Sequence, residues 1–298
     1  MQTSRTGNFL AALSFLVWGL LPLYYHQLPQ ADVNELLALR IIFSIPCMLL
    51  FMGLLRRPLP PIATILADKR SLIICCLASL LMCVSWYSFI WATTHGEVLA
   101  ASLGFFINPL ISIALGVLFL KEQLSSLQRL AVALAIAGIG YQVYHYGQFP
   151  WLSLCMGSFF ALYSLCKKHI RYDALTSVTI EAAVLLPFAL IFMVWQYVSQ
   201  QSVALSSGLS TFLFYVGAAP ATLVPLIIFA LAISRTSLSM VGLMQYIEPS
   251  LQFILAVYVF GELFDSVKMI SFSLIWIGLL LCSLEAIARP LRRRLRPI

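Results

Sequence analysis

Charged residues are scarce in this sequence. Of its 298 residues only 10% are Asp, Glu, Lys or Arg, whereas 61% are apolar, and the mean hydropathy is +0.97. A soluble globular domain carries roughly 25% charged residues, so this composition excludes a water-soluble fold. One helical crossing of a bilayer takes about 20 apolar residues, and the apolar runs come close to filling the chain. No room is left for a soluble domain.

The sequence also lacks the motifs of several enzyme classes. It contains no His-Glu-x-x-His zinc motif, no Gly-x-Ser-x-Gly nucleophile elbow and no Gly-x-x-x-x-Gly-Lys-Ser/Thr phosphate loop. All seven cysteines fall inside apolar runs, without zinc spacing or a disulfide framework. These absences disfavour an intramembrane enzyme and an ATP-driven pump, and they give no reason to expect a cofactor or a metal.

Hydropathy windows of about 19 residues predict ten transmembrane helices. They lie near 7–27, 35–55, 71–93, 97–120, 127–146, 150–166, 174–199, 210–233, 238–260 and 267–288. The first run is expected to be a retained helix, because Tyr24, Tyr25 and His26 stand where a signal peptide has small cleavage-site residues. We therefore expect an all-α integral membrane protein.

The basic residues predict the orientation of these helices. With the N-terminus in the cytoplasm, sixteen of the eighteen Lys and Arg residues fall on the cytoplasmic side. The exceptions are Lys268, which lies outside, and Arg40, which lies within a span. An even number of helices also keeps the basic cluster at 292–296 inside. The net charge of +7 is thus a topology signal, and both termini are predicted to be cytoplasmic.

The chain repeats itself. An offset of 140 aligns residues 84–138 with 224–278 without a gap and gives 12 identical pairs in 55 positions, among them Pro109 with Pro249 and Glu122 with Glu262. We predict two five-helix repeats, 1–146 and 147–298. Because five is odd, the second repeat enters the membrane inverted, and inverted repeats around a midplane site are typical of secondary transporters.

Arg40 lies in the second predicted span, where a central charge costs about 2.5–3.5 kcal/mol on insertion scales. We predict Glu181 as its partner, because an offset of 141 makes the two residues counterparts across the pseudo-symmetry axis. The same offset pairs Pro46 with Pro187. The pair would bind the substrate or a coupling ion. The alternatives are a structural ion pair, or an Arg40 that reaches the outer surface.

A second polar group lies on the ninth span. Gln245, Glu248 and Gln252 form one stripe of a helix, and their counterparts on the fourth span are Phe105, Asn108 and Ser112. Pro109 and Pro249 interrupt the two stripes and are expected, with Pro46 and Pro187, to kink or hinge their helices. Polar groups at this depth line a water-filled cavity or join helices by hydrogen bonds.

Two further features bear on a transport site. Trp18, Trp86 and Tyr246 are candidates to face the cavity, with packing or an interfacial belt as the alternative for each. Glu181 and Glu248 are the only carboxylates deep in the predicted spans, so a proton-coupled mechanism would use one of them. The sequence leaves open which one exchanges the proton.

Several motifs carry a family resemblance. Ala-Ala-Ser-Leu-Gly-Phe-Phe-Ile-Asn-Pro-Leu at 100–110, the following Gly-Val-Leu-Phe-Leu-Lys-Glu, and Gln-Tyr-Ile-Glu-Pro-Ser at 245–250 resemble the RarD-type branch of the EamA family of drug/metabolite transporters. Trp18-Gly19 and Arg40 also resemble that branch, and the likeness covers essentially the whole chain. It implies a ten-helix exporter-type fold with a central cavity, in the inner membrane of a bacterium.

The function expected from these features is secondary transport by alternating access. The predicted substrates are small metabolites, amino-acid-like or other carboxylate compounds for which Arg40 is suited, or amphipathic drugs that suit the aromatic surroundings. Protons are the candidate coupling ion, membrane lipid is the other expected partner, and no nucleic acid is expected. A non-transporting scaffold or sensor is the main alternative, and an intramembrane enzyme is the least favoured.

Overall fold

Every regular element in the described part of the chain is a helix, as expected for an all-α protein. The computed structural model describes residues 5–25, 27, 32–94, 98–147, 151–259 and 265–294. The helices are α1 (Arg5–Tyr25), α2 (Val33–Leu54), α3 (Ile62–Ala67), α4 (Lys69–Thr94), α5 (Val98–Leu120), α6 (Ser126–Tyr146), α7 (Trp151–His169), α8 (Ala174–Val198), α9 (Val203–Ser206), α10 (Leu209–Ile233), α11 (Leu238–Gln245), α12 (Ile247–Tyr258) and α13 (Ser266–Arg294).

The long helices coincide along the chain with the predicted spans. Within the described ranges, six are long and apolar enough to cross a membrane: α1, Asn34–Leu54 of α2, Lys69–Ser88 of α4, α6, α8 and α10. Large apolar side chains cover their outer faces; Leu54 and Ile191, for example, are 71% and 69% exposed. Exposed apolar surface of this extent is unfavourable in water and contacts lipid instead. The bundle is therefore a multi-pass membrane protein.

Polar side chains determine where several helices begin. Asp32 caps α2 and Asp173 caps α8, each accepting a 2.8 Å hydrogen bond from the backbone N–H three residues later. Ser125 takes part in a capping box at the start of α6. At the start of α4, the backbone N–H and the hydroxyl of Ser71 donate to Asp68, and these bonds hold the pKa of Asp68 below its usual range. Such caps satisfy N–H groups that a helix leaves without partners.

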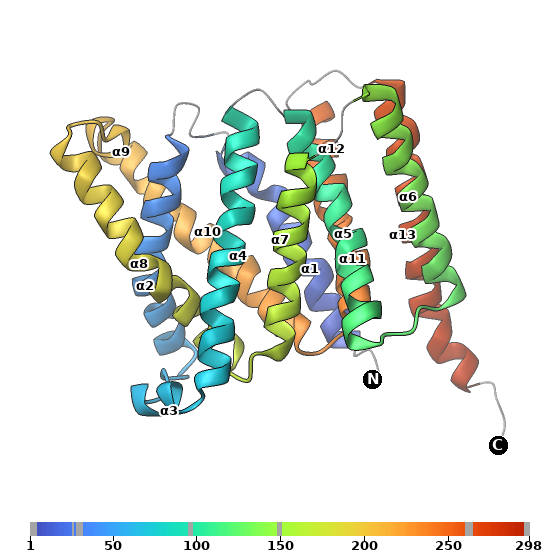
Figure 1. Ribbon diagram of the computed structural model, residues 1–298, viewed down its shortest axis with the longest axis horizontal. Coiled ribbons are helices and arrows are strands. Elements are labelled where there is room, and N and C mark those ends of the chain that lie inside the picture. The colour runs from blue at the N-terminus through green and yellow to red at the C-terminus, as the bar shows by residue number, and fades with distance from the viewer. Residues whose placement is uncertain are drawn as a thin grey trace.

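The helices stand side by side in one bundle (Figure 1). Helix α1 packs on α10, α11 and α12, while α7 packs on α4 and α5; α2 packs on α8 and α10, and α4 packs also on α8. Buried Phe15, Trp18, Tyr163 and Phe229 fill the centre, where α1, α7 and α10 meet. Helix α1 begins and α13 ends at one end of the bundle, called here the terminal end; α9 lies at the other, the α9 end (Figure 1).

Helices α6 and α13 form a close pair at one side of the bundle (Figure 1). A Cβ on Gly138 of α6 would lie 2.9 Å from the carbonyl oxygen of Ser271, whose hydroxyl donates to the Gly138 carbonyl at 2.9 Å. A Cβ on Gly278 of α13 would lie 3.2 Å from the backbone of Ala131. Small residues at these two points let the backbones approach, as is common between helices in membranes.

The ninth predicted span is divided into two helices, α11 and α12, which separate at Tyr246. Pro249 lies at the third position of α12 and has no N–H to donate to the carbonyl four residues earlier. By contrast, α2, α5 and α8 continue through Pro46, Pro109 and Pro187. A hinge role for these four prolines stays a prediction.

Candidate functional site

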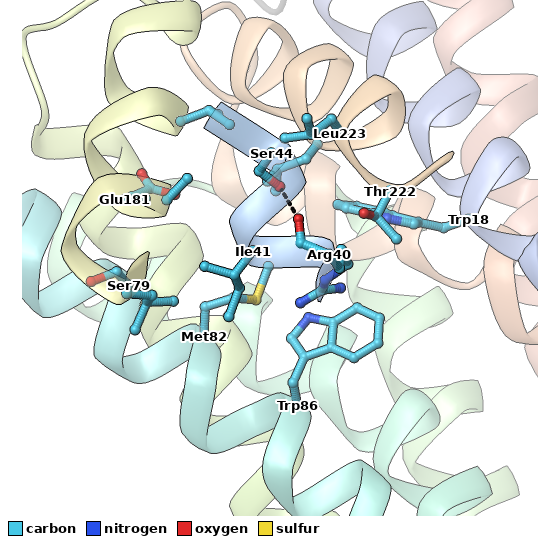
Figure 2. Close-up of a pocket in the computed structure, with 14 residues that line it drawn as sticks. Trp18, Arg40, Ile41, Ser44, Ser79, Met82, Trp86, Glu181, Thr222 and Leu223 are labelled. Carbon is cyan, nitrogen blue, oxygen red and sulfur yellow. Dashed lines mark hydrogen bonds between the residues drawn. The ribbon is translucent and has the colours of Figure 1, made fainter. Parts of the chain in front are cut away.

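Two cavities adjoin between the helices of the bundle. The first, of about 80 Å³, lies among α1, α2, α4, α8 and α10 and is lined by both Arg40 and Glu181 (Figure 2). The second, of about 110 Å³, lies among α1, α4, α5, α7 and α12 and is lined by Glu248. Trp18 and Trp86 line both cavities. Since about 10–15 Å³ on this measure holds one water, each cavity has room for several waters or part of a solute.

Arg40 stacks on an aromatic ring. Its Cζ lies 4.4 Å from the ring centroid of Trp86, which is a cation–π contact (Figure 2). Among the described residues the guanidinium forms no ion pair and donates no hydrogen bond. A guanidinium carries five N–H donors in a planar fork that suits a carboxylate. Arg40 therefore presents an anion-binding group to the first cavity.

Glu181 does not pair with Arg40, so the predicted pair is wrong. Its Oε1 accepts a 2.6 Å bond from Lys167 Nζ, and its Oε2 accepts a 3.1 Å bond from the Tyr163 hydroxyl. Lys167 also donates to the hydroxyl of Ser177 at 2.8 Å. Lys167 and Glu181 are both buried, at 6% exposure each. Lys167 is therefore a core cation with two acceptors.

The directions of α2 and α8 explain why the two counterparts do not meet. Arg40 is the eighth residue of α2 and Glu181 the eighth of α8, so each lies about 10 Å inside the start of its helix. However, α2 begins at the α9 end, whereas α8 begins at the terminal end (Figure 1). The two residues thus lie at different heights along the bundle, although both line the first cavity. Lys167, two residues before the end of α7, lies at the terminal end and reaches Glu181 instead.

The polar stripe of the ninth span contributes to the second cavity. Glu248 and Gln252 line it together with Asn108 of α5. Gln252 Nε2 lies 3.4 Å from Glu248 Oε1, and the hydroxyl of Ser112 donates to Asn108 Oδ1 at 3.4 Å. No cation contacts Glu248 among the described residues. The structure thus places Glu248, Gln252 and Asn108 on the wall of the second cavity, whereas Ser112, which bonds to Asn108, does not line it.

Gln245 and Tyr246 lie away from both cavities, in the packed region where α11 ends. Gln245 is 3% exposed and Tyr246 2%, and Tyr246 packs near Phe106. Within the described residues, neither the side-chain amide of Gln245 nor the hydroxyl of Tyr246 has a hydrogen-bond partner. A buried polar group without a partner costs about 1–3 kcal/mol. Their predicted role in substrate binding stays a prediction.

Helices at the terminal end of the bundle are joined by bonds that the sequence did not predict. Both carboxylate oxygens of Glu122 accept N–H bonds of 2.7 Å at the start of α11, from Leu238 and Ser239. The hydroxyl of Thr236 donates to Asn8 of α1, and Lys168 of α7 donates to the Thr236 carbonyl. The repeat had marked Glu122 through its match with Glu262, and this was the one available signal.

Glu35 is a second carboxylate missed by sequence reasoning. It is fully buried, and its Oε2 and Oε1 accept N–H bonds from Ala204 and Val203 at 2.8 and 3.2 Å. These bonds tie the start of α9 to α2. Nothing in the sequence distinguished Glu35 from an ordinary residue at a helix start.

A sequence model of the EamA-like transporter family matches the chain twice, over residues 5–143 and 150–284. The chain belongs to the EamA-like transporter family. The two matched stretches together span most of the protein, and each contains one of the stripes described above.

Individual relatives of this EamA-like protein agree with the family match. The uncharacterized transporter YojE of Bacillus subtilis (strain 168) is 38% identical over 94% of this chain and 95% of its own length. Protein RarD of Escherichia coli (strain K12) is 35% identical over 96% of both chains. The chloramphenicol-sensitive protein RarD of Pseudomonas aeruginosa is 30% identical over 99% of both chains. The chain is therefore a membrane transporter of the family that includes the RarD proteins.

A solved protein structure shares the fold. It aligns with a TM-score of 0.71 at 16% identity, covering 94% of this chain and 99% of the other. At that identity the likeness concerns the arrangement of helices and not the substrate.

Proposed function

We propose that the protein is a secondary transporter that exports small zwitterionic or carboxylate metabolites, amino-acid-like in chemistry, by alternating access. The observation that carries this proposal is the pair of adjoining cavities. Arg40 offers a cation to the first, Glu248 offers a carboxylate to the second, and Trp18 and Trp86 lie on the wall of both. A solute with a carboxylate, an amine and an apolar body matches these three features. The direction of export follows from the resemblance to the drug/metabolite exporters.

Alternating access is supported by the symmetry of the packing. The repeat makes α1 the counterpart of α7, α4 of α10, and α5 of α11 with α12. Accordingly α7 packs on α4 and α5, while α1 packs on α10, α11 and α12. In the α6 and α13 pair, Gly138 meets Ser271 and Gly278 meets Ala131, which are the same contact after an offset of 140. These reciprocal contacts favour two inverted five-helix repeats, 1–146 and 147–298, and ten crossings.

The proposed orientation places the terminal end in the cytoplasm of a bacterium, with the protein in the inner membrane. The bias of sixteen basic residues to that side supports it. In this orientation the bonds of Glu122, Thr236 and Lys168 close the cytoplasmic side. The lining of the second cavity, from Tyr25 at the end of α1 to Met156 near the start of α7, lies in the outer half. The structure then represents an outward-facing form.

Glu248 is the proposed proton-exchanging group. It borders the second cavity, and no cation contacts it among the described residues. Glu181 is the weaker candidate because Lys167 and Tyr163 already bind both of its oxygens.

An amphipathic drug is the second candidate substrate, since one relative is named chloramphenicol-sensitive and the apolar walls of both cavities would accept an aromatic ring.

The proposal predicts saturable flux in reconstituted vesicles. Radiolabelled phenylalanine, leucine and chloramphenicol are offered to wild-type protein, to Glu248→Gln and to Asp265→Asn, a control carboxylate outside both cavities. Wild-type protein should carry at least one amino acid, with a rate that changes between about pH 6 and pH 8. Glu248→Gln should fold but lose that pH dependence, because the amide cannot exchange the proton, while Asp265→Asn should behave as wild type. No flux of any probe would favour a scaffold or sensor.

The orientation predicts the outcome of reporter fusions. A phosphatase that is active only outside the cytoplasm should be inactive when fused after Ile298 and active when inserted near Ser206, at the α9 end. A reporter that is active only in the cytoplasm should give the opposite pattern at the same two positions. If both reporters reverse, the proposed orientation and the even number of crossings are wrong.

A further inference from the structure

An open crevice of about 480 Å³ lies where α2 reaches the terminal end of the bundle. Among the described residues its walls are Leu49, Met52, Gly53, Arg56, Pro58 and Leu59, of which Arg56 alone is charged. The apolar span of α2 ends at Leu54, whose side chain is 71% exposed. The crevice therefore lies at the level where the hydrocarbon of the bilayer gives way to the lipid headgroups.

Helix α3 lies next to this crevice with apolar side chains outward. Ile62 and Leu66 share one face of the helix and are 71% and 53% exposed. Ile65 is buried in a cluster against which Leu59 of the crevice wall packs, and the Tyr172 hydroxyl donates to the Ile65 carbonyl at 2.7 Å. These contacts fix α3 at the terminal end (Figure 1), and its exposed face suits the boundary between headgroups and acyl chains.

Exposed basic side chains flank α3 on both sides. They are Arg56, Arg57, Lys69, Arg70 and Arg171, called here the basic cluster. Arg171 is held near the start of α4 by a 3.1 Å bond from its backbone N–H to the Ser71 hydroxyl. Among the described residues none of the five forms an ion pair. The carboxylates in the same segments, Asp68 and Asp173, accept bonds at helix starts and number only two, so positive charge is in excess.

The opposite end of the bundle has the same backbone turn without the charge. At the end of α2, Arg56 has a φ of 52°, and the N–H groups of Arg56 and Arg57 donate to carbonyls three and five residues earlier. At the end of α8, Gln200 has a φ of 53°, and Gln200 and Gln201 make the same two bonds. The turn thus does not require arginine. Membrane orientation accounts for basic residues at the terminal end, but not for an arginine on the wall of an apolar crevice.

We propose that the crevice and the basic cluster bind one anionic glycerophospholipid of the cytoplasmic leaflet. One acyl chain lies in the crevice against Leu49 and Met52, and Arg56 at its wall binds the phosphate, for which the planar guanidinium is suited. The other members of the cluster attract the negative charge of the headgroup. The leaflet rests on the orientation given by the proposed function, whereas the binding itself does not depend on transport.

Native mass spectrometry of the purified full chain in non-ionic detergent tests this binding. The probes are dioleoyl-phosphatidylglycerol and dioleoyl-phosphatidylethanolamine, which have the same acyl chains and differ in headgroup charge. Wild-type protein should retain one phosphatidylglycerol with at least tenfold higher affinity. Each basic residue near an anionic lipid surface is worth about fivefold in affinity, so Arg56→Gln combined with Arg57→Gln should weaken phosphatidylglycerol binding at least tenfold. Glutamine occupies the same turn at Gln200, so the backbone should be kept.

Two further variants separate a lipid site from general surface charge. Gly53→Phe keeps every charge but fills the crevice, where a Cβ on Gly53 would meet no atom within 4 Å, and it should also weaken phosphatidylglycerol binding. Arg129→Gln is the matched control: it removes an exposed arginine of α6 that bonds to Ser126, and it should bind as wild type. Thermal unfolding without added lipid shows whether each variant folds. The arginine pair and Gly53 alter different parts of the site, so either variant alone carries the test.

The outcomes are distinct. Equal affinity for the two lipids, unchanged binding in Gly53→Phe, or an equal loss in Arg129→Gln would overturn the proposal. Displacement of the bound lipid by an equal concentration of glycerophosphoglycerol, the headgroup without chains, would show a site for soluble anions and would overturn it too. A reversed reporter pattern would assign the site to the outer leaflet without changing these affinities, and a failed flux assay would not change them either.

Discussion

Replacing Lys167 with Met is expected to destabilise the protein by about 3–5 kcal/mol, seen as a large loss of membrane abundance and a lower unfolding temperature in detergent. The change leaves the Glu181 carboxylate in the core with the Tyr163 hydroxyl as its remaining described donor. Met keeps the apolar stem of the lysine, so the loss reports the missing cation rather than missing packing. Abundance measured by quantitative blotting, with thermal unfolding of purified protein, provides the test.

A double-mutant cycle shows whether the effect belongs to the pair. Adding Glu181→Gln to Lys167→Met removes both charges and should recover most of the stability, because two neutral groups of similar volume replace a buried ion pair. Lys168→Met is the matched control, because the Lys168 side chain donates to the Thr236 carbonyl instead and should show no coupling to Glu181. Arg40 should also show little coupling to Glu181 in abundance. Additive losses for Lys167 and Glu181 would refute the bond as a source of stability.

Arg40→Gln should have the opposite profile, with near-normal abundance and a loss of transport. Among the described residues Arg40 stacks on Trp86 without an ion pair, so its removal leaves no described carboxylate unpaired. If Arg40 binds the substrate carboxylate, flux of a zwitterion such as phenylalanine should fall roughly 100-fold, as expected for truncating one partner of a buried charge pair. Initial rates in reconstituted vesicles measure this effect.

The controls for Arg40 separate binding from folding. Phenethylamine, which has the ring and the amine but no carboxylate, should be carried equally by wild type and by Arg40→Gln if it is carried at all. Arg40→Lys keeps the charge but loses the planar fork and its stacking, and it should retain only part of the phenylalanine flux. Equal phenylalanine flux in wild type and Arg40→Gln would make Arg40 a structural residue of the outer half.

Sequence patterns predicted the helices well because the bilayer imposes a simple rule. A crossing needs a long apolar run in which all backbone groups bond internally, and such runs are visible without knowing how helices pack. The short helices α3 and α9 were not predicted, because each depends on local contacts. For α9 that contact is with Glu35, whose bonds to Val203 and Ala204 span some 170 positions of sequence. Hydropathy carries no information about such a bond.

The candidate site was partly predictable. Polar and charged residues inside apolar runs identified Arg40, Glu248 and Asn108, and the structure places all three on the walls of the two cavities. The partner of Glu181 was predicted wrongly, because repeat correspondence was taken to mean equal depth. Helices α2 and α8 begin at opposite ends of the bundle, so residues near their starts lie at different depths.

The sequence by itself determined the class of the protein and its family, since these follow from composition, run length and motifs read along one chain. Only the tertiary structure decided that Lys167 is the partner of Glu181, that Trp18 and Trp86 line both cavities, and that Glu122 binds the start of α11. Each of these depends on which faces of distant helices meet. Side-chain packing and the pairing of buried charges determine which faces meet, and they outweigh the preferences of any short stretch of sequence.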